Sequence, residues 1–197
     1  TQLIDEIKSL ARNVEHVKEV VAMQQNYARV SGVTAIQSVP ELIEDALCVH
    51  TAALESQHIR VVRSFETVPD IIVDKHRVLQ ILVNLISNAK WALSQCAGTE
   101  PVLTLGIHVN DDKRLRISVA DNGVGISPEN LERLFRHGFT TRSEGHGFGL
   151  HSSILAAQDM GASLTAQSQG LGKGATFLLA IPILPGEKDG ERATIHS

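Results

Sequence analysis

The stretch ILVNLISNAKWAL, residues 81–93, limits the possible folds of this chain more than any other segment. Apolar residues in and just before it recur at spacings of three and four, which predicts a helix with one face in a hydrophobic core. Such a helix is stable only when other elements cover its apolar face, so the chain must build a core around it. The apolar positions are Val78, Leu82, Leu85, Ala89 and Ala92.

A second, polar stripe runs along the same predicted helix. Its members are spaced so that they share one face: His76, Gln80, Asn84 and Asn88. A buried carboxamide without a hydrogen-bond partner destabilises a fold by about 1–3 kcal/mol. The two asparagines are therefore either ordinary surface or backbone-capping amides, or members of a functional site, and this helix alone leaves both interpretations open.

Composition and charge restrict the class of protein. A chain of 197 residues holds one full domain plus an extension too small to fold alone. With 18 Lys and Arg against 22 Asp and Glu, we expect no nucleic-acid-binding surface. There is no run of about 18 apolar residues, so we expect no direct membrane contact. Cys48 and Cys96 form no CxxC pair, which favours reduced thiols and a cytoplasmic protein.

Residues 1–32 predict a coiled-coil-like helix, because apolar residues step alternately by four and three. These residues are Leu3, Ile7, Leu10, Val14, Val17 and Val21. One helix cannot bury this seam alone, so we expect a partner helix from a second copy or from sequence outside this chain. A helix packed on its own domain is the alternative. SGVT at 31–34 and Pro40 interrupt the pattern, which predicts a linker at residues 33–40. The chain lacks an initiator methionine, so we expect a fragment of a longer protein.

Residues 41–184 mix helix and strand patterns without the regular alternation of a parallel fold, which predicts an α+β two-layer sandwich. The polar tail, residues 185–197, is expected to fray. Helices are predicted at 40–54, 74–95, 128–136 and 150–160. Strands are predicted at 59–66, 70–74, 102–109, 114–121, 163–169 and 175–181.

The motif DNGVG, residues 121–125, follows directly on a predicted strand. Asp121 offers an acceptor suited to an exocyclic amine, and Gly123 and Gly125 let the backbone approach a flat ring. A simple turn is the alternative interpretation.

Two further glycine-rich motifs follow. GHGFGL, residues 145–150, precedes a helix predicted to start near Phe148, and backbone N–H groups at a helix start favour phosphate. GKGATF, residues 172–177, offers the hydroxyl of Thr176. A flexible connection and a plain hairpin turn are the respective alternatives.

In this order the segments resemble the ATP-binding domain shared by sensor histidine kinases, DNA gyrase and related ATPases. NLISNA is similar to the asparagine box, DNGVG to the first glycine box, and LFRHGFTT to the phenylalanine box. GHGFGL is similar to the second glycine box and GKGATF to the last. The resemblance covers about residues 40–183. It implies a Bergerat-type fold, with a mixed sheet against three helices and ATP beneath a mobile lid at about residues 138–148.

The resemblance also implies roles for individual residues. Asn88 is expected to hold Mg²⁺, and Asn84 to assist at the metal or the phosphates. Asp121 is expected to bind the adenine amine, with Gly123 and Gly125 bordering the ring. The remaining residues expected to contact ATP are Lys90, Ile126, Phe139, Thr140, Thr141, Gly145, His146, Gly147, Phe148, Gly149, Leu150 and Thr176.

The position of the basic residue expected near the phosphates departs from the family pattern. Many of these kinases have a lysine three residues after the second asparagine, whereas this chain has Trp91 there and Lys90 before it. Lys90 lies about 100° away around the helix, so it is expected to point off the phosphates. Arg142 is the better catalytic candidate for the γ-phosphate, with His146 as a further one. We interpret Trp91 as a packing residue.

The first asparagine of the pair indicates the branch of the family. ATP-hydrolysing members carry a glutamate there that activates water, and an amide such as that of Asn84 has no useful basicity. Transfer to an imidazole, itself a nucleophile, needs less help. The pattern therefore resembles a histidine kinase that uses MgATP and passes the phosphoryl group to the receiver domain of a response regulator.

The N-terminal helix is similar to the second helix of the dimerisation and phosphotransfer hairpin of two-component sensor kinases, which implies a homodimer through residues 1–32. His16 lacks the acidic or amide neighbour that acceptor histidines usually have, so we expect the acceptor on a preceding helix outside this chain. The full-length protein could also be attached to a membrane. The alternatives are a degenerate ATP-binding and dimerisation module, a serine kinase of the same fold and, disfavoured by Asn84, a gyrase-like hydrolase.

Overall fold

The computed structural model describes residues 33–96, 98–110, 114–142 and 147–183. The chain divides into two compact units, Thr1–Val33 and Thr34–Ser197, and every helix and strand of the described residues belongs to the second. The predicted N-terminal helix with His16 and the predicted tail lie outside the described residues.

A mixed five-stranded sheet forms one layer of this unit, with strand order β2-β4-β5-β7-β6. The edge strand β2 runs parallel to β4, and the other neighbours are antiparallel. The strands are β2 (Arg60–Phe65), β4 (Val102–Val109), β5 (Arg114–Asp121), β6 (Ser163–Gln167) and β7 (Ala175–Pro182). Each corresponds to a predicted strand, because each carries the period-two alternation or the continuous apolar run of a covered strand.

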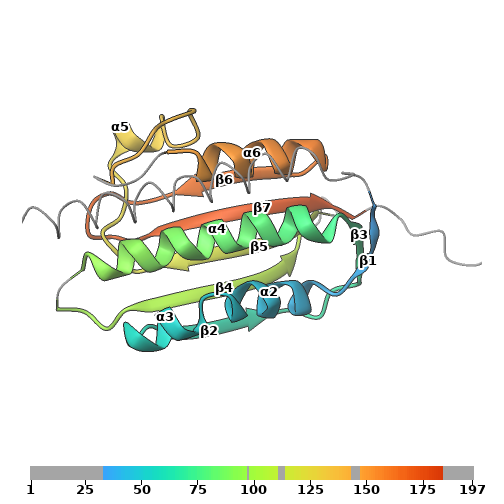
Figure 1. Ribbon diagram of the computed structural model, residues 1–197, viewed down its shortest axis with the longest axis horizontal. Coiled ribbons are helices and arrows are strands. Elements are labelled where there is room, and N and C mark those ends of the chain that lie inside the picture. The colour runs from blue at the N-terminus through green and yellow to red at the C-terminus, as the bar shows by residue number, and fades with distance from the viewer. Residues whose placement is uncertain (1–32, 97, 111–113, 143–146, 184–197) are drawn as a thin grey trace, which may run out of the picture. The chain divides into compact units, whose positions relative to one another are not determined.

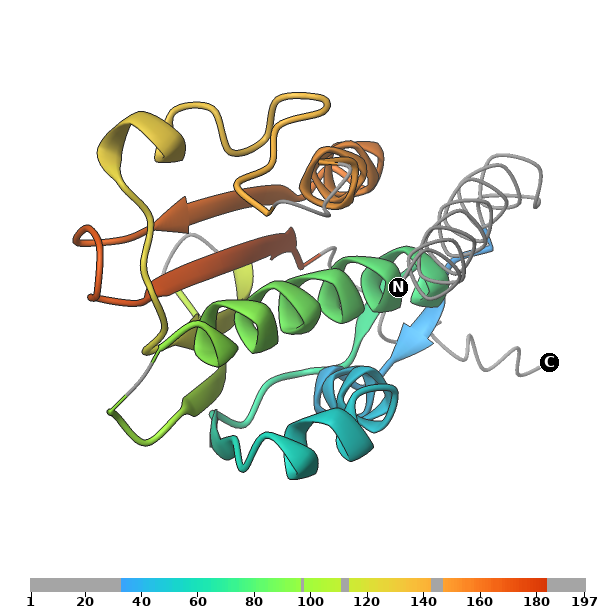
Figure 2. The ribbon, with the colours of Figure 1, turned by 60° about the vertical axis from the view of Figure 1, so that its left-hand side comes forward.

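Three helices form the second layer, on one face of the sheet (Figure 2). Figure 1 shows α4 (Lys75–Ser94) between α2 (Val39–Cys48) and α6 (Gly149–Asp159), and α4 packs against both. This arrangement is the predicted α+β sandwich of a mixed sheet on three helices. Within the described ranges, no helix has the length and apolar character needed to cross a membrane.

The core lies between these two layers. From α4 it takes Val78, Leu82, Leu85 and Ala89 as predicted, while Ala92 is only half-buried. On β5 the alternation is regular: Leu115, Ile117 and Val119 point to the helices and are fully buried. The last residue that this alternation directs to the helices is Asp121, so the strand that builds the core also delivers a carboxylate to its edge.

A separate two-stranded sheet closes one end of the unit. It pairs β1 (Ala35–Gln37) antiparallel with β3 (Ile71–Val73). Thus part of the segment for which the sequence predicts a linker is a strand. After β3, the carboxylate of Asp74 caps α4 by accepting from the backbone N–H of His76 at 3.0 Å and of Arg77 at 3.3 Å.

Two predicted helices are shorter than their sequence patterns indicate. The helix predicted at 40–54 breaks into α2 and α3 (Thr51–Ser56), because His50 leaves the helical path and its Nε2 bonds the carbonyl of Val83 on α4 at 3.0 Å. The helix predicted at 128–136 is a single turn, α5 (Pro128–Leu131), followed by further turns. In both places local periodicity continues, but tertiary contacts or successive turns end the helix.

Candidate functional site

The carboxylate of Asp121 lies at the end of β5 and is 9% exposed. Its Oδ1 accepts a hydrogen bond from the backbone N–H of Gly123 at 2.9 Å. Burial raises the pKa of Asp121 from 3.8 to about 6, while hydrogen bonds from the backbone of Gly123 and Ala175 oppose the change. A buried acceptor with so few partners is suited to a ligand that brings its own N–H donor.

Close backbone packing holds the segment after Asp121 in place. At Gly174 a Cβ would lie 2.0 Å from the carbonyl oxygen of Asp121, and at Gly125 it would lie 2.1 Å from the carbonyl oxygen of Gly170. The two segments are also joined by hydrogen bonds from Gly174 N to Gly123 O at 3.1 Å and from Gly172 N to Val124 O at 2.7 Å. The DNGVG and GKGATF motifs are therefore one interlocked unit that only glycine permits at these positions.

The first asparagine of the polar stripe joins two helices. Asn84 Nδ2 donates to Ser153 Oγ at 2.8 Å, and Ser153 Oγ donates to the carbonyl of Gly149 at 2.9 Å. A Cβ at Gly149 would lie 2.4 Å from Asn84 Oδ1, so the start of α6 packs directly on this amide. Ser153, which is 1% exposed, was not predicted as a site residue from the sequence. Its position one turn after Gly149 could have indicated that it shares the face of the helix start.

The second asparagine meets a cation from the loop before α6. Asn88 Oδ1 accepts a short hydrogen bond from Arg142 Nη2, and Asn88 Nδ2 is buried without a partner among the described residues. The Arg142 guanidinium also lies over the ring of Trp91, 4.8 Å from its centroid. Partial burial holds the pKa of Arg142 below its usual value. The structure thus brings together Asn88, Arg142 and Trp91.

The ends of the predicted lid lie against each other. Gly147 has φ +70°, and its Cβ would lie 2.4 Å from the carbonyl carbon of Gly138. The ring of Phe148 contacts His137 at a centroid distance of 4.9 Å. His151 lies 5.1 Å from His137, edge to face, and its Nδ1 bonds the carbonyl of Phe135 at 3.0 Å. The predicted residues Gly145 and His146 lie outside the described residues.

Five other predicted residues lie among the described residues. Thr140 Oγ1 accepts from the backbone N–H of Arg142 at 3.0 Å, while Thr141 is exposed. Phe139 lies under the guanidinium of Arg133 at 5.0 Å. Ile126 is half-buried against the core, and its N–H donates to Ser168 Oγ at 3.0 Å. Leu150, in the first turn of α6, is likewise half-buried against the core.

Two predicted residues are not brought to this site. Thr176 pairs with Ala120, so strand alternation places it on the sheet face opposite to the one that carries Asp121 and its partner Ala175. Lys90 lies near enough to His50 that its charge lowers the pKa of that histidine, after the larger effects of burial and the bond to Val83. The charge of Lys90 therefore acts on His50, at the start of α3, and the helix geometry turns Lys90 about 100° away from Trp91.

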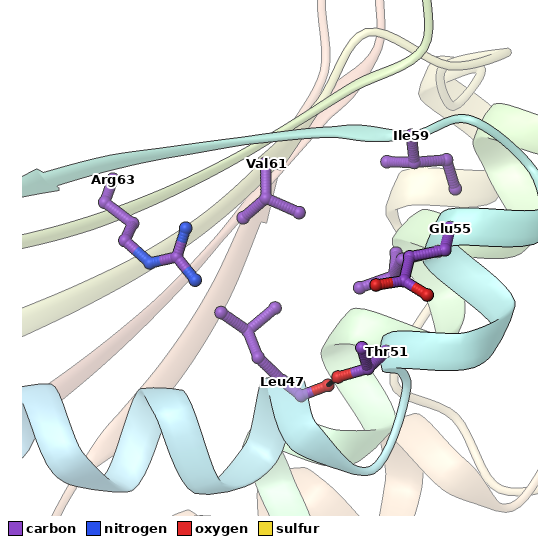
Figure 3. A pocket seen from close by; sticks show the side chains of 7 residues that line it. Leu47, Thr51, Glu55, Ile59, Val61 and Arg63 are labelled. Atoms are coloured by element: carbon purple, nitrogen blue, oxygen red, sulfur yellow. Dashed lines mark hydrogen bonds between the residues drawn. The ribbon is translucent and has the colours of Figure 1, made fainter.

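A separate cavity of about 300 Å³ lies between α2, α3 and β2 (Figure 3). Its lining is mixed, with aliphatic side chains beside the charged Glu55 and Arg63, and Arg63 is bonded to Glu44 at 2.6 and 2.9 Å. None of the predicted site residues lines it. Among the described residues there is also no cluster of three His, Cys, Asp or Glu side chains able to hold a metal ion. The chemistry-bearing motifs meet instead around α4, the end of β5 and the start of α6.

Comparison with known proteins identifies the family of this chain. Residues 73–185 match the family described as "Histidine kinase-, DNA gyrase B-, and HSP90-like ATPase". The chain is 31% identical to the Sensor protein FixL of Bradyrhizobium diazoefficiens over 170 residues, 86% of this chain and 32% of that protein. The chain spans about a quarter to a third of the length of the first curated relatives that it matches.

Two solved structures share the fold. Full-length ShkA in complex with AMPPNP has a TM-score of 0.75 at 24% identity, covering 93% of this chain and 39% of that one. Histidine kinase ThkA in complex with response regulator protein TrrA has a TM-score of 0.71 at 20% identity, covering 90% and 50%. At these identities the likeness shows the fold alone.

The glycines of the β6–β7 loop provide a matched pair of substitutions. At Gly172 (φ +73°) a Cβ would have no atom within 4 Å, whereas at Gly174 (φ +68°) it would meet the backbone of Asp121. We expect Gly172→Ala to cost about 1 kcal/mol for the left-handed backbone alone. Gly174→Ala is expected to cost about 3 kcal/mol or more, because the backbone itself must move. Urea unfolding of both variants measures this difference, and equal losses would contradict the interlocked packing.

The pKa of Asp121 predicts a pH-dependent effect of Asp121→Asn on stability. Burial raises the pKa of Asp121 from 3.8 in the unfolded chain to about 6 in the folded one, so ionising this carboxyl costs the folded protein free energy. This cost is absent below the unfolded-state pKa, and above the folded-state pKa it lowers the free energy of unfolding by its full amount. An asparagine does not titrate. The free energy of unfolding of the variant minus that of the wild type should therefore rise by about 2–3 kcal/mol between about pH 4 and pH 7.

Denaturant unfolding at several pH values tests this expectation, with the exposed Asp70→Asn as the control. The control is expected to keep the pH dependence of the wild type. A difference between Asp121→Asn and wild type that stays constant with pH would contradict a buried carboxyl with a raised pKa.

Proposed function

This chain belongs to the histidine kinase-, DNA gyrase B- and HSP90-like ATPase family, and from this membership we propose that it is the catalytic core of a sensor histidine kinase. In this proposal it binds MgATP and transfers the γ-phosphoryl group to a histidine. The observation that carries the choice of reaction is Asn84, an amide whose nitrogen is already bonded to Ser153. A residue that cannot take a proton does not activate water, so hydrolysis is disfavoured.

We assign adenine recognition to Asp121. Its carboxylate is buried away from solvent, and an exocyclic amine would supply a hydrogen-bond donor there. The backbone of Gly123 and Gly125 forms the edge of this place, where side chains are sterically excluded. In this assignment the half-buried side chains of Ile126 and Leu150 supply apolar contacts around the adenine ring.

We assign the phosphates and Mg²⁺ to the two asparagines of the polar stripe and the loop that faces them. The residues fit a divalent metal, because the amide oxygen of Asn88 already attracts a cation, the guanidinium of Arg142. When bound there, Mg²⁺ supplies positive charge to the phosphate oxygens. Asn88 would hold it, Asn84 would orient the neighbouring oxygens, and Arg142 would contact the γ-phosphate. The backbone around Gly147 and Gly149, at the start of α6, would bind the remaining phosphate charge.

The transfer step needs no reagent besides ATP and the acceptor histidine. A nitrogen of the acceptor imidazole attacks the γ-phosphorus, the bond to the bridging oxygen of ADP breaks, and the imidazole proton passes to solvent. This chain's contribution is to position the phosphate chain and to stabilise its charge. The acceptor is proposed to lie on a helix preceding residue 1, with residues 1–32 as the second helix of a dimeric hairpin.

We further propose that a response-regulator receiver domain takes the phosphoryl group. The solved structure of ThkA, which shares this fold, is a complex with response regulator protein TrrA, and this supports the proposal by analogy. Residues 41–184 would then be the ATP-binding catalytic domain, joined by the segment 33–40 to the dimerisation helix.

Nucleotide binding by this chain is expected to depend on Asp121 and on Mg²⁺. In calorimetric titration ATP should bind the wild type, and removing Mg²⁺ should weaken that binding. Asp121→Asn should weaken it by about tenfold or more, because the buried amide offers a poorer acceptor. Asp70→Asn is the charge-matched control and should bind as the wild type does. Absence of binding to folded wild-type chain would contradict the proposal.

Phosphoryl transfer is expected from the full-length protein. Incubation with γ-labelled MgATP should give a label on the protein that is labile to acid and stable to base, as a phosphorus–nitrogen bond is. His16→Gln should retain the label if the acceptor lies on the preceding helix. An acid-stable label would instead indicate a serine kinase, and steady release of ADP without labelled protein would indicate a hydrolase.

A further inference from the structure

Trp91 lies on the same face of α4 as Asn88, because the two are three residues apart on one helix. Its ring is the surface on which the Arg142 guanidinium rests, 4.8 Å from the centroid. Arg142 therefore has two partners from α4, a hydrogen-bond acceptor and an aromatic face, one turn apart.

Arg142 needs this platform because it is a cation with little compensation. It is half-buried, and its partners among the described residues, the amide of Asn88 and the ring of Trp91, carry no negative charge. Within the described part of its own loop, the Arg142 backbone N–H bonds Thr140 Oγ1, which fixes the backbone and not the guanidinium. The position of the charged group is thus determined by Asn88 and Trp91.

The two partners differ in what nucleotide binding would do to them. Asn88 Oδ1 is the oxygen that the proposed function gives to Mg²⁺, so it cannot serve both cations at once. The face of Trp91 has no such competing role. A guanidinium that leaves Asn88 can stay on the ring and turn its N–H groups toward a phosphate.

We propose that Trp91 is a positioning residue that holds Arg142 at the amide pair and lets its guanidinium exchange Asn88 for the terminal phosphate of ATP. This inference rests on the proposed function, that the site binds MgATP. It replaces the interpretation of Trp91 as a packing residue. Lys90, next to it in sequence, acts electrostatically on His50 instead.

The inference predicts an effect on the discrimination between ATP and ADP. Separating Arg142 from Asn88 is needed before Mg²⁺ can bind with either nucleotide, so this cost cancels in the ratio of the two dissociation constants. A contact with the terminal phosphate of ATP does not cancel. The ratio Kd(ADP)/Kd(ATP) therefore reports the contact that Trp91 is proposed to support, whereas a loss of packing would weaken both nucleotides alike.

The experiment is a double-mutant cycle on the whole chain, with MgATP and MgADP titrated by calorimetry. Trp91→Leu should lower Kd(ADP)/Kd(ATP) by about three- to tenfold, the range of a partly desolvated cation–π contact. Trp91→Phe, which keeps an aromatic face, should lower it less. Arg142→Met should lower it at least as much as Trp91→Leu, and Trp91→Leu should add nothing in the Arg142→Met background.

Arg133→Met is the matched control, since it removes the same charge from another arginine that lies over an aromatic ring, that of Phe139. It should leave the ratio within about twofold of the wild type. Thermal unfolding checks that each variant is folded, and Trp91→Met takes the place of Trp91→Leu if the leucine variant is not.

The outcomes separate the two proposals. If the wild type discriminates ATP from ADP and Trp91→Leu leaves the ratio unchanged, or if the two substitutions act additively, this inference is overturned and the proposed function stands. If folded wild-type chain binds neither nucleotide, the proposed function fails and the inference falls with it.

Discussion

The buried carboxylate of Asp121 is the feature on which the arrangement of the site depends. The alternation of β5 places it on the core face, where water cannot reach it freely, and its few backbone donors do not offset the cost of burial. The loops around it have little freedom to relax this cost, because Gly125 and Gly174 bring backbone against backbone. The fold therefore holds a costly charge in a fixed place, as a ligand site requires and a simple turn does not.

Helix α4 connects this carboxylate to the other polar groups. Its apolar stripe is the centre of the core, so its orientation is set by packing against α2, α6 and the sheet. Once that orientation is fixed, the polar stripe must face the start of α6 and the loop before it. Asn84 then bonds Ser153, while Asn88 accepts from Arg142 and keeps a buried amide nitrogen that has no partner in the described part of the chain. The same helix thus supplies both the stability and the wall of the site.

Sequence patterns predicted the regular part of this structure well. The strands at 102–109 and 114–121 were predicted with the bounds that the structure gives, because alternation over eight residues has one interpretation. Periodicity failed where a single distant contact decides, as at His50, whose bond to Val83 separates α2 from α3. The GKGATF motif likewise does not reveal which of its residues shares a face with Asp121: the register pairs Asp121 with Ala175, and Thr176 with Ala120. Register is a property of the sheet, not of the motif.

The contact between Arg142 and Asn88 lay beyond sequence reasoning for a different reason. Each residue could be assigned a ligand separately, a phosphate for one and a metal for the other, but a chain without those ligands must satisfy its own buried groups. The guanidinium of Arg142 is suited to a phosphate and the amide oxygen of Asn88 to a metal ion, so without those ligands the two groups bind each other. The aromatic face of Trp91 also contacts this guanidinium. Groups suited to bind a phosphate and its metal will tend to pair in their absence, so nucleotide affinity in such a site is the difference between two sets of contacts and not the sum of one.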